Sequence, residues 1–309
     1  MLEIRNLSKN FGALVAVDDV SFTVSRGEVL GFLGPNGAGK STTMKMATGF
    51  LAPSAGTAVI CGADIQERPL AAKRQFGYLP EGAPAYPDMT VAEFLRFVAH
   101  IRGLRGAEAR GKISRIVELV HLDEVFQQRI DTLSKGFRRR VGVAQALIHD
   151  PPVVILDEPT DGLDPNQKYE MRGILAAMQA EKAIIISTHL LEEVEAVCSR
   201  AIIIAHGRIL ADAAPAELAA RSRFHNAVRL YIEPGNEARI RGDLAGLPAV
   251  AAVDTVDGGR ALLVMPRDGQ PIAPEIAELA EGRDWRIGGF TVERGRLDDV
   301  FRAITAPAA

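Results

Sequence analysis

Apolar runs and helical periodicities alternate along the first two thirds of the chain. Four short segments are apolar at almost every position: Val29–Leu33, Val153–Leu156, Ala183–Ser187 and Ala201–Ala205. Such runs are typical of central parallel strands that are covered on both faces. Because helical stretches separate them, the pattern predicts an α/β layer fold with a parallel sheet.

Between residues 86 and 148 the pattern becomes mainly helical. Val91–Ile101 and Lys112–Val120 place apolar residues three and four positions apart, as amphipathic helices do. We therefore expect a helical subdomain, about residues 86–148, inserted into the α/β core.

An alanine-rich stretch, Ala211–Arg223, predicts a short helix that leads into a linker. We place a domain boundary there, which gives domains 1–222 and 223–309. The second domain is predicted as a small α+β domain of ferredoxin-like β-α-β-β-α-β order, with Trp285 in its core. Its predicted elements are strand 227–233, helix 237–247, strands 250–256 and 260–265, helix 273–280, strand 285–292 and a final helix 297–304.

Composition narrows the functional classes. The chain has 309 residues, and 36 basic against 39 acidic side chains give a net charge of −3, which argues against a nucleic-acid-binding protein. No apolar run reaches the roughly 18 residues of a membrane span, and the polar, strand-like start Leu2–Leu7 predicts no signal peptide. Cys61 and Cys198 are far apart in sequence, so we expect buried, unpaired thiols.

One motif carries phosphate chemistry. The residues Gly34, Pro35, Asn36, Gly37, Ala38, Gly39, Lys40 and Ser41 match G-x-x-x-x-G-K-[ST] between a predicted strand and a predicted helix. In such a loop backbone N–H groups converge on phosphate oxygens at a helix N-terminus. Lys40 would reach the β- and γ-phosphates and the Ser41 hydroxyl would bind Mg²⁺.

A second signal is an apolar strand that ends in two carboxylates, Asp157 and Glu158. Neighbouring residues of a strand point to opposite sides, so the two can divide their work. Asp157 would hold Mg²⁺, and Glu158 would orient and deprotonate an attacking water. A solvated strand end is the alternative, and the phosphate-binding loop upstream makes it the weaker one.

Further segments make the combination specific. Leu133–Phe137 and the helical Arg138–Leu147 resemble the signature segment of ABC ATPases, Asp161–Asp164 resembles their D-loop, and His189 their switch histidine. Over about residues 1–220 the chain resembles an ABC transporter ATP-binding subunit. Within that family it is similar to the exporter branch of drug-efflux and gliding-motility ATPases, whose chain end also resembles Leu297–Phe301.

The resemblance implies a head-to-tail dimer that encloses two MgATP molecules. Ser134 and Gly136 would contact the γ-phosphate bound by the partner subunit, His189 would sense that phosphate, and Asp164 would connect the two sites. Phe11 would stack on adenine, and Thr42 would join the phosphate-binding loop. The implied protein is an ATPase that works as a homodimer beneath a separate integral-membrane permease, at the inner face of the cell membrane.

This sequence departs from the family pattern in its signature, where Lys135 and Phe137 replace Gly and Gln. Glu81 stands where most members carry a metal-contacting glutamine, so we expect it near Mg²⁺ with an added negative charge. The adjoining loop Glu81–Pro87 and the helical subdomain are the expected coupling surface for the permease. Arg138–Arg140 are expected on a solvated helix face.

Two other functions stay open. One is a soluble ABC ATPase that acts on ribosomes or DNA, although a single phosphate-binding loop and about 90 residues between loop and signature disfavour it. The other is an importer ATPase, since export follows from the resemblance alone. The cargo is not encoded in these residues.

Overall fold

The computed structural model describes residues 1–233 and 235–306. It divides into two compact units, Met1–Ala213 and Ala214–Ala309. The division precedes α8 (Pro215–Ala219), whereas the sequence placed the boundary after residue 222. The reason is that α8 packs against the last helix, α11 (Leu297–Thr305), within the second unit.

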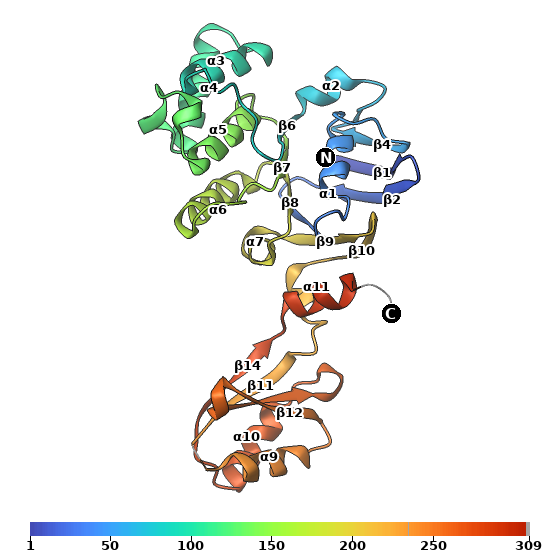
Figure 1. Cartoon of the computed structure of the whole chain (residues 1–309), viewed down its shortest axis with the longest axis vertical. Coiled ribbons are helices and arrows are strands. Elements are labelled where there is room, and N and C mark those ends of the chain that lie inside the picture. The colour runs from blue at the N-terminus through green and yellow to red at the C-terminus, as the bar shows by residue number, and fades with distance from the viewer. Residues whose placement is uncertain (234, 307–309) are drawn as a thin grey trace. The chain divides into compact units, whose positions relative to one another are not determined.

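The first unit is built on a six-stranded sheet of order β10-β9-β3-β8-β7-β6 (Figure 1). Its neighbouring strands are parallel except for the β9–β10 pair. The four apolar runs form four of these strands, so the prediction of a parallel core is confirmed. The strands are β3 (Val29–Leu33), β6 (Phe76–Leu79), β7 (Val153–Asp157), β8 (Ala183–Thr188), β9 (Arg200–Ala205) and β10 (Arg208–Ala213).

A second, antiparallel sheet of order β2-β1-β4-β5 belongs to the same unit. Its strands are β1 (Leu2–Phe11), β2 (Leu14–Val24), β4 (Ala55–Ile60) and β5 (Ala63–Asp64). Helix α1 (Lys40–Ala47) contacts strands of both sheets and lies between them. One apolar core therefore surrounds α1, and it fixes the helix whose first residues follow the glycine-rich loop.

Helices cover the other face of the six-stranded sheet and form a second core. They include α3 (Val91–Ile101), α4 (Gly106–Leu119), α5 (Lys135–Leu147) and α6 (Pro165–Gln179); α2 (Pro69–Arg74) and α7 (Leu191–Val197) complete the unit. Thr90 and Glu93 form a capping box that starts α3. Helix α4 begins at Gly106, six residues before the predicted residue 112, because the residues before Lys112 are mostly polar or small and add no apolar periodicity to the sequence.

Close backbone packing sets the position of α5 on strand β6. A Cβ atom added to Gly77 would lie 1.9 Å from the carbonyl oxygen of Ala146, so only glycine fits there. Farther along, the Gln145 side chain donates from Nε2 to the Tyr78 carbonyl oxygen at 2.6 Å. The helix that carries the signature segment is thus held against the strand that leads to Glu81.

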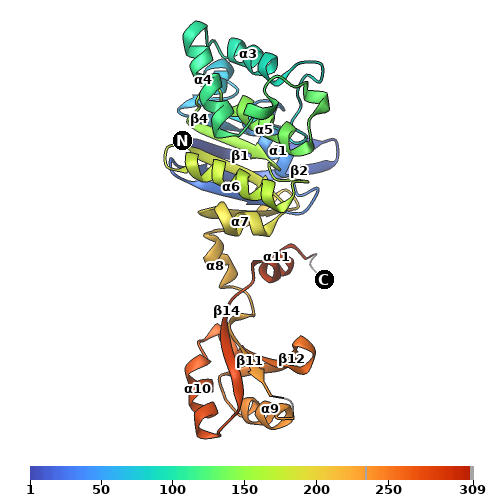
Figure 2. The ribbon, with the colours of Figure 1, turned by 90° about the vertical axis from the view of Figure 1, so that its left-hand side faces the viewer.

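The second unit has the predicted order β-α-β-β-α-β (Figure 2). Its elements are β11 (His225–Ile232), α9 (Glu237–Ala245), β12 (Val250–Val256), β13 (Ala261–Pro266), α10 (Ala273–Gly282) and β14 (Ile287–Arg294). The strands form one antiparallel sheet of order β12-β13-β11-β14. Trp285 is buried in its core, as predicted, and donates from Nε1 to Asp243 at 3.2 Å.

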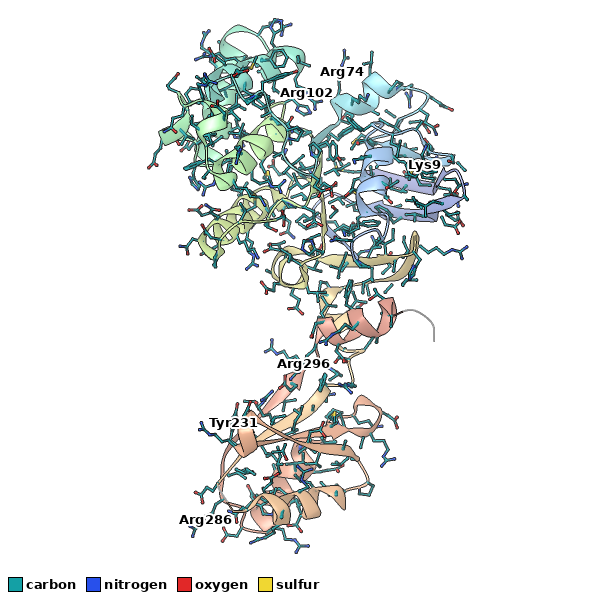
Figure 3. The ribbon with its side chains drawn as sticks, viewed as in Figure 1. Lys9, Arg74, Arg102, Tyr231, Arg286 and Arg296 are labelled. Atoms are coloured by element: carbon teal, nitrogen blue, oxygen red, sulfur yellow. The ribbon has the colours of Figure 1, made fainter. Side chains whose placement is uncertain are left out.

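The residues that precede β11 are bound to residues in and just before the last helix, α11. The Ser222 hydroxyl donates to Asp299 of α11 at 2.8 Å. The Arg296 guanidinium lies 4.3 Å from the ring centroid of Phe224, a cation–π contact (Figure 3). These contacts place the residues around 222 inside the second unit.

The expectation for the cysteines is wrong for Cys61. This residue is exposed, because it occupies the tight turn between β4 and β5 with φ +47°. Cys198 is half-buried, and burial raises the pKa of its thiol to about 12. Among the described residues no helix is long and apolar enough to cross a bilayer.

Candidate nucleotide-binding site

The glycine-rich loop, Gly34–Ser41, joins the end of β3 to the start of α1, which is the predicted strand–loop–helix context. A Cβ at Gly34 would lie 2.3 Å from the Ile204 carbonyl oxygen, and Gly39 has φ +104°. Both positions therefore require glycine. The loop borders a hollow of about 330 Å³, lined by Ala16, Asn36, Gly37, Ala38, Gly39, Lys40, Ser41, Thr42, Glu81 and Glu158.

Lys40 is the cation of this hollow. Its side chain is buried, and Nζ donates to the carbonyl oxygens of Gly34 at 2.7 Å and Pro35 at 3.2 Å. Nζ also lies 3.9 Å from a carboxylate oxygen of Glu158. Burial lowers the pKa of Lys40, and the carboxylates of Glu158, Asp157 and Glu81 oppose that shift. These carboxylates favour the charged form of the ammonium, which faces the hollow beneath the glycine-rich loop.

Asp157 is fully buried at the end of β7 and faces the first turn of α1. Its Oδ1 accepts from the Ser41 hydroxyl at 3.3 Å and from the Ser187 hydroxyl. Its Oδ2 is buried and has no hydrogen-bond partner among the described residues. A buried carboxylate oxygen without a partner, next to a hydroxyl, is a donor set that suits Mg²⁺.

No group of three or more His, Cys, Asp or Glu side chains within residues 1–233 and 235–306 could hold a metal by itself. The pair Ser41 and Asp157 therefore fits a metal ion that takes its other ligands from phosphate and water, as Mg²⁺ commonly does.

Glu158 follows directly after β7 but leaves the strand conformation. Its φ is +50°, and its backbone N–H donates to the Ser187 carbonyl oxygen at 2.9 Å. The sequence predicted that Asp157 and Glu158 point to opposite sides because both would belong to one strand. In the structure the turn at Glu158 separates the two side chains instead. Asp157 points to Ser41 and Ser187, while Glu158 faces Lys40 and His189.

His189 lies beside Glu158, with 3.0 Å between its Nδ1 and Glu158 Oε2. The imidazole is partly exposed and follows β8, whose last residue is Thr188. The chain thus brings together a buried carboxylate and a partly exposed imidazole, two groups able to exchange a proton or share a hydrogen bond.

Glu81 comes shortly after β6 and lines the same hollow as the glycine-rich loop. The pKa of the nearby Tyr78 phenol is raised by burial and further by the carboxylates of Asp157 and Glu81. Glu81 therefore lines the hollow together with Glu158, and its carboxylate also acts on the charge of Lys40.

Other candidates do not line this hollow. Phe11 ends β1 with an exposed ring, and the Lys9 ammonium lies 5.2 Å from its centroid (Figure 3). Ser134 is the N-cap of α5, where its hydroxyl accepts from the Phe137 N–H at 3.3 Å, and Gly136 follows in the first turn. Asp164 is the N-cap of α6. Ser134 and Asp164 are exposed at helix N-termini, which favour anions.

The expectation of a solvated face for Arg138–Arg140 is wrong for Arg139, whose side chain is only 3% exposed. Sequence reasoning missed it because three consecutive arginines on a helix usually face water. Ser187 was also missed as a partner of Asp157, since a serine at the end of an apolar strand carries no distinctive signal.

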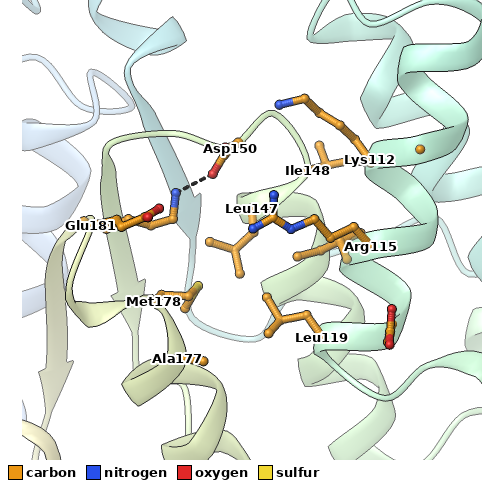
Figure 4. Close-up of a pocket in the computed structure, with 13 residues that line it drawn as sticks. Lys112, Arg115, Leu119, Leu147, Ile148, Asp150, Ala177, Met178 and Glu181 are labelled. Carbon is orange, nitrogen blue, oxygen red and sulfur yellow. Dashed lines mark hydrogen bonds and ion pairs between the residues drawn. The ribbon is translucent and has the colours of Figure 1, made fainter.

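Further hollows lie in the first unit, among them the following two. A groove of about 810 Å³ between α2 and α3 exposes Phe50, Leu70 and Ile101. Figure 4 shows a second hollow, of about 470 Å³, bordered by α4, α5 and α6, where Lys182 pairs with Asp150 at 2.6 Å. Its lining includes none of the candidate residues named above.

Comparisons with known proteins agree with this geometry. A family model described as "ABC transporter" matches residues 17–161. The "Nod factor export ATP-binding protein I" of Paraburkholderia xenovorans (strain LB400) is 33% identical over 98% of this chain and 96% of its own length. The "Probable multidrug ABC transporter ATP-binding protein YbhF" of Escherichia coli (strain K12) is 38% identical over 72% of this chain and 38% of its own length.

A solved structure described as "Structure of ATP binding subunit of ABC transporter" is 33% identical and superposes with a TM-score of 0.66. It covers 71% of this chain, and this chain covers 91% of it. With a buried lysine beneath a glycine-rich loop, a carboxylate pair at the end of β7 and relatives that match almost end to end, the chain belongs to the ABC transporter family, as an ATP-binding subunit with the ATPase fold.

Proposed function

We propose that this chain is the ATP-hydrolysing motor of an ABC exporter, acting as a homodimer on a separate integral-membrane permease. The observation that carries the proposal is the hollow where Lys40, Glu81 and Glu158 meet the glycine-rich loop. Export is supported by the relative described as a Nod factor export protein, which matches both units of this chain.

In this proposal the loop residues Gly34–Thr42 hold the phosphates of ATP, with Lys40 against the β- and γ-phosphates. Phe11 stacks on adenine. Ser41 and Asp157 would hold Mg²⁺, with Glu81 nearby as a direct or water-mediated ligand. Bound there, Mg²⁺ would neutralise charge on the phosphate oxygens.

Hydrolysis then depends on the chain's own side chains. Glu158 accepts a proton from a water molecule whose oxygen attacks the γ-phosphorus, and the bond from that phosphorus to the bridging oxygen breaks to give ADP and phosphate. Lys40 stabilises the charge that develops on the transferred group. His189, 3.0 Å from Glu158, orients that carboxylate and hydrogen-bonds the γ-phosphate.

A second subunit completes each site. Ser134 and Gly136 at the start of α5 would approach the γ-phosphate bound by the partner subunit, and Asp164 would connect the two sites. Ser134 and Asp164 are exposed at helix N-termini, which supports this role, since these positions attract anions from outside the subunit.

The permease docks, in our proposal, in the groove between α2 and α3. Phe50, Leu70 and Ile101 expose 79%, 74% and 65% of their surface there, which is uncommon for large apolar side chains. Arg74 and Arg102 add positive charge to the rim. The loop from Glu81 to Pro87 connects this region to the nucleotide hollow, so docking would keep the protein at the inner face of the membrane.

The test is co-purification of the full chain from native membranes in mild detergent. A multi-spanning protein at near-equal stoichiometry, together with ATP hydrolysis that Lys40→Ala abolishes, supports the proposal. An active ATPase that is reproducibly absent from membranes would instead favour the soluble, non-transport class.

A further inference from the structure

Arg139 is a buried cation that the proposed mechanism does not use. It lies in the middle of α5 and exposes 3% of its surface. One of its terminal nitrogens, Nη1, is buried without a hydrogen-bond partner among the described residues. A buried guanidinium without compensation costs several kcal/mol, so something nearby must offset its charge.

The packing of α5 shows where this side chain lies. Gly136, Arg139 and Gly142 are three positions apart and share one face of the helix. A Cβ at Gly136 would contact the Gln167 side chain at 2.6 Å, and one at Gly142 would contact Leu79 at 2.6 Å and Ala83 at 2.9 Å. Arg139 therefore lies between the start of α6 and the loop after β6.

The charges around Arg139 come from the nucleotide site. Burial lowers the pKa of Arg139, and four carboxylates act in the opposite direction. In decreasing order of effect they are Asp161, Glu158, Asp157 and Glu81. The two with the largest effect, Asp161 and Glu158, lie at the two ends of the short turn that follows β7. Glu158 is also the proposed general base.

A second cation of α5 reaches the same turn. Lys135, one helical turn before Arg139, lies with its Nζ 3.0 Å from Asp161 Oδ2. Both side chains of this pair are about half exposed, so water screens it and it contributes little to stability. It orients Asp161 at the surface, whereas Arg139 is buried and the carboxylates of the turn act on its charge.

We propose that Arg139 is a positioning residue of the ATPase site: from the signature helix of the same subunit it supplies the buried counter-charge that holds the Glu158–Asp161 turn in its active arrangement. This rests on the proposed ATPase function. Lys40, the other buried cation of the site, already binds two carbonyl oxygens and lies beside Glu158. Without Arg139, Asp161 would keep only its solvent-screened pair with Lys135, and the other three carboxylates would share Lys40, so their repulsion would displace the turn.

The experiment compares full-length Arg139→Gln with Arg138→Gln, a matched loss of charge at the exposed neighbouring position. We expect Arg139→Gln to lower kcat more than tenfold while the Kd for MgADP changes less than threefold, because the glycine-rich loop and Lys40 remain. Arg138→Gln should stay within twofold in both. A folded Arg139→Gln variant with kcat within tenfold of wild type overturns the inference, and so does a loss of MgADP affinity as large as the loss of kcat.

A mutant cycle with Asp161→Asn separates positioning from a general loss of packing. If Arg139 acts on the turn, removing it from the Asp161→Asn variant should lower kcat less than it does in wild type. If the two substitutions together lower kcat by the product of their separate effects, the inference is overturned.

If Arg139→Gln fails to fold, Arg139→Lys is the deciding variant. A kcat within tenfold of wild type supports the charge role, and a larger loss of kcat at unchanged melting temperature refutes it. A wild-type chain that does not hydrolyse ATP overturns the proposed function as well, whereas an active wild type with an active Arg139→Gln variant overturns this inference alone.

Discussion

Replacing Glu158 by glutamine separates the two roles that its position gives it. The carboxylate is 90% buried as a side chain and lies 3.9 Å from Lys40 Nζ, where an effective dielectric constant of 20 gives an attraction of about 4 kcal/mol. Glutamine keeps the shape and removes this attraction. Lys40 keeps its hydrogen bonds to Gly34 and Pro35, so we expect the loop to keep its conformation.

The substitution should lower the rate of ATP hydrolysis without weakening the binding of MgATP. Loss of a general base costs about 10²–10⁴ in rate, which corresponds to about 3–5 kcal/mol in activation free energy. Loss of a negative charge beside the phosphates removes repulsion, so the affinity for MgATP should be unchanged or tighter. Glu158→Gln should therefore bind MgATP, lower phosphate release at least a hundredfold, and accumulate as a dimer.

Phosphate release under saturating MgATP measures the first effect, and sedimentation velocity with and without MgATP measures the second. Glu195→Gln, the same change at an exposed position of α7, is the control and should behave as wild type. Turnover within tenfold of wild type in Glu158→Gln would remove Glu158 from the role of base. Unchanged monomer in MgATP would refute the enclosed dimer.

Three other changes test separate parts of the structure. Glu81→Gln should keep the Kd for nucleotide within threefold but shift the Mg²⁺ concentration for half-maximal ATPase activity severalfold; an unchanged Mg²⁺ response would make Glu81 an ordinary loop residue. Leu70→Glu should abolish co-purification with the permease while basal ATPase activity is retained, whereas Leu210→Glu, on β10 outside the groove, should leave both unchanged; co-purification of the Leu70→Glu variant would exclude this docking surface. Burial and nearby cations, chiefly Arg102, lower the pKa of His149 from 6.5 to about 4, so the unfolded chain binds the extra proton first and stability is lost as pH falls from 6.5 towards 4. The loss should reach about 3 kcal/mol at most, and urea unfolding of His149→Gln should show a correspondingly smaller acid-dependent decrease; an equal decrease would exclude His149 as its source.

Local signals explain why much of this molecule could be predicted. The residues Gly34–Ser41 must follow a strand and precede a helix to bind phosphate, and both elements are encoded in the flanking residues. The apolar runs around Val153 and Ala183 are too uniformly apolar for anything but buried strands. In the second unit, clear turn residues separate the short strands, so the element order could be predicted from the sequence.

What escaped prediction depends on contacts between distant segments. Arg139 is buried, and the carboxylates that favour its charge most, Asp161 and Glu158, come from a turn about twenty residues away in sequence. The positive φ of Glu158 is likewise invisible in a strand pattern that runs through Asp157. Residue 222 belongs to the second unit because it binds Asp299, which no local composition signal could indicate.

The turn between β4 and β5 gives the two cysteines different chemical availability. Thiol-modifying reagents attack the thiolate, and a pKa of about 12 leaves half-buried Cys198 almost entirely protonated near neutral pH. Burial raises the pKa of Cys61 as well, but its thiol is exposed at the turn and reagents can reach it. The unmodified sequence therefore offers one favoured attachment point for a fluorophore or spin label, on the antiparallel sheet of the first unit, without any cysteine having to be removed.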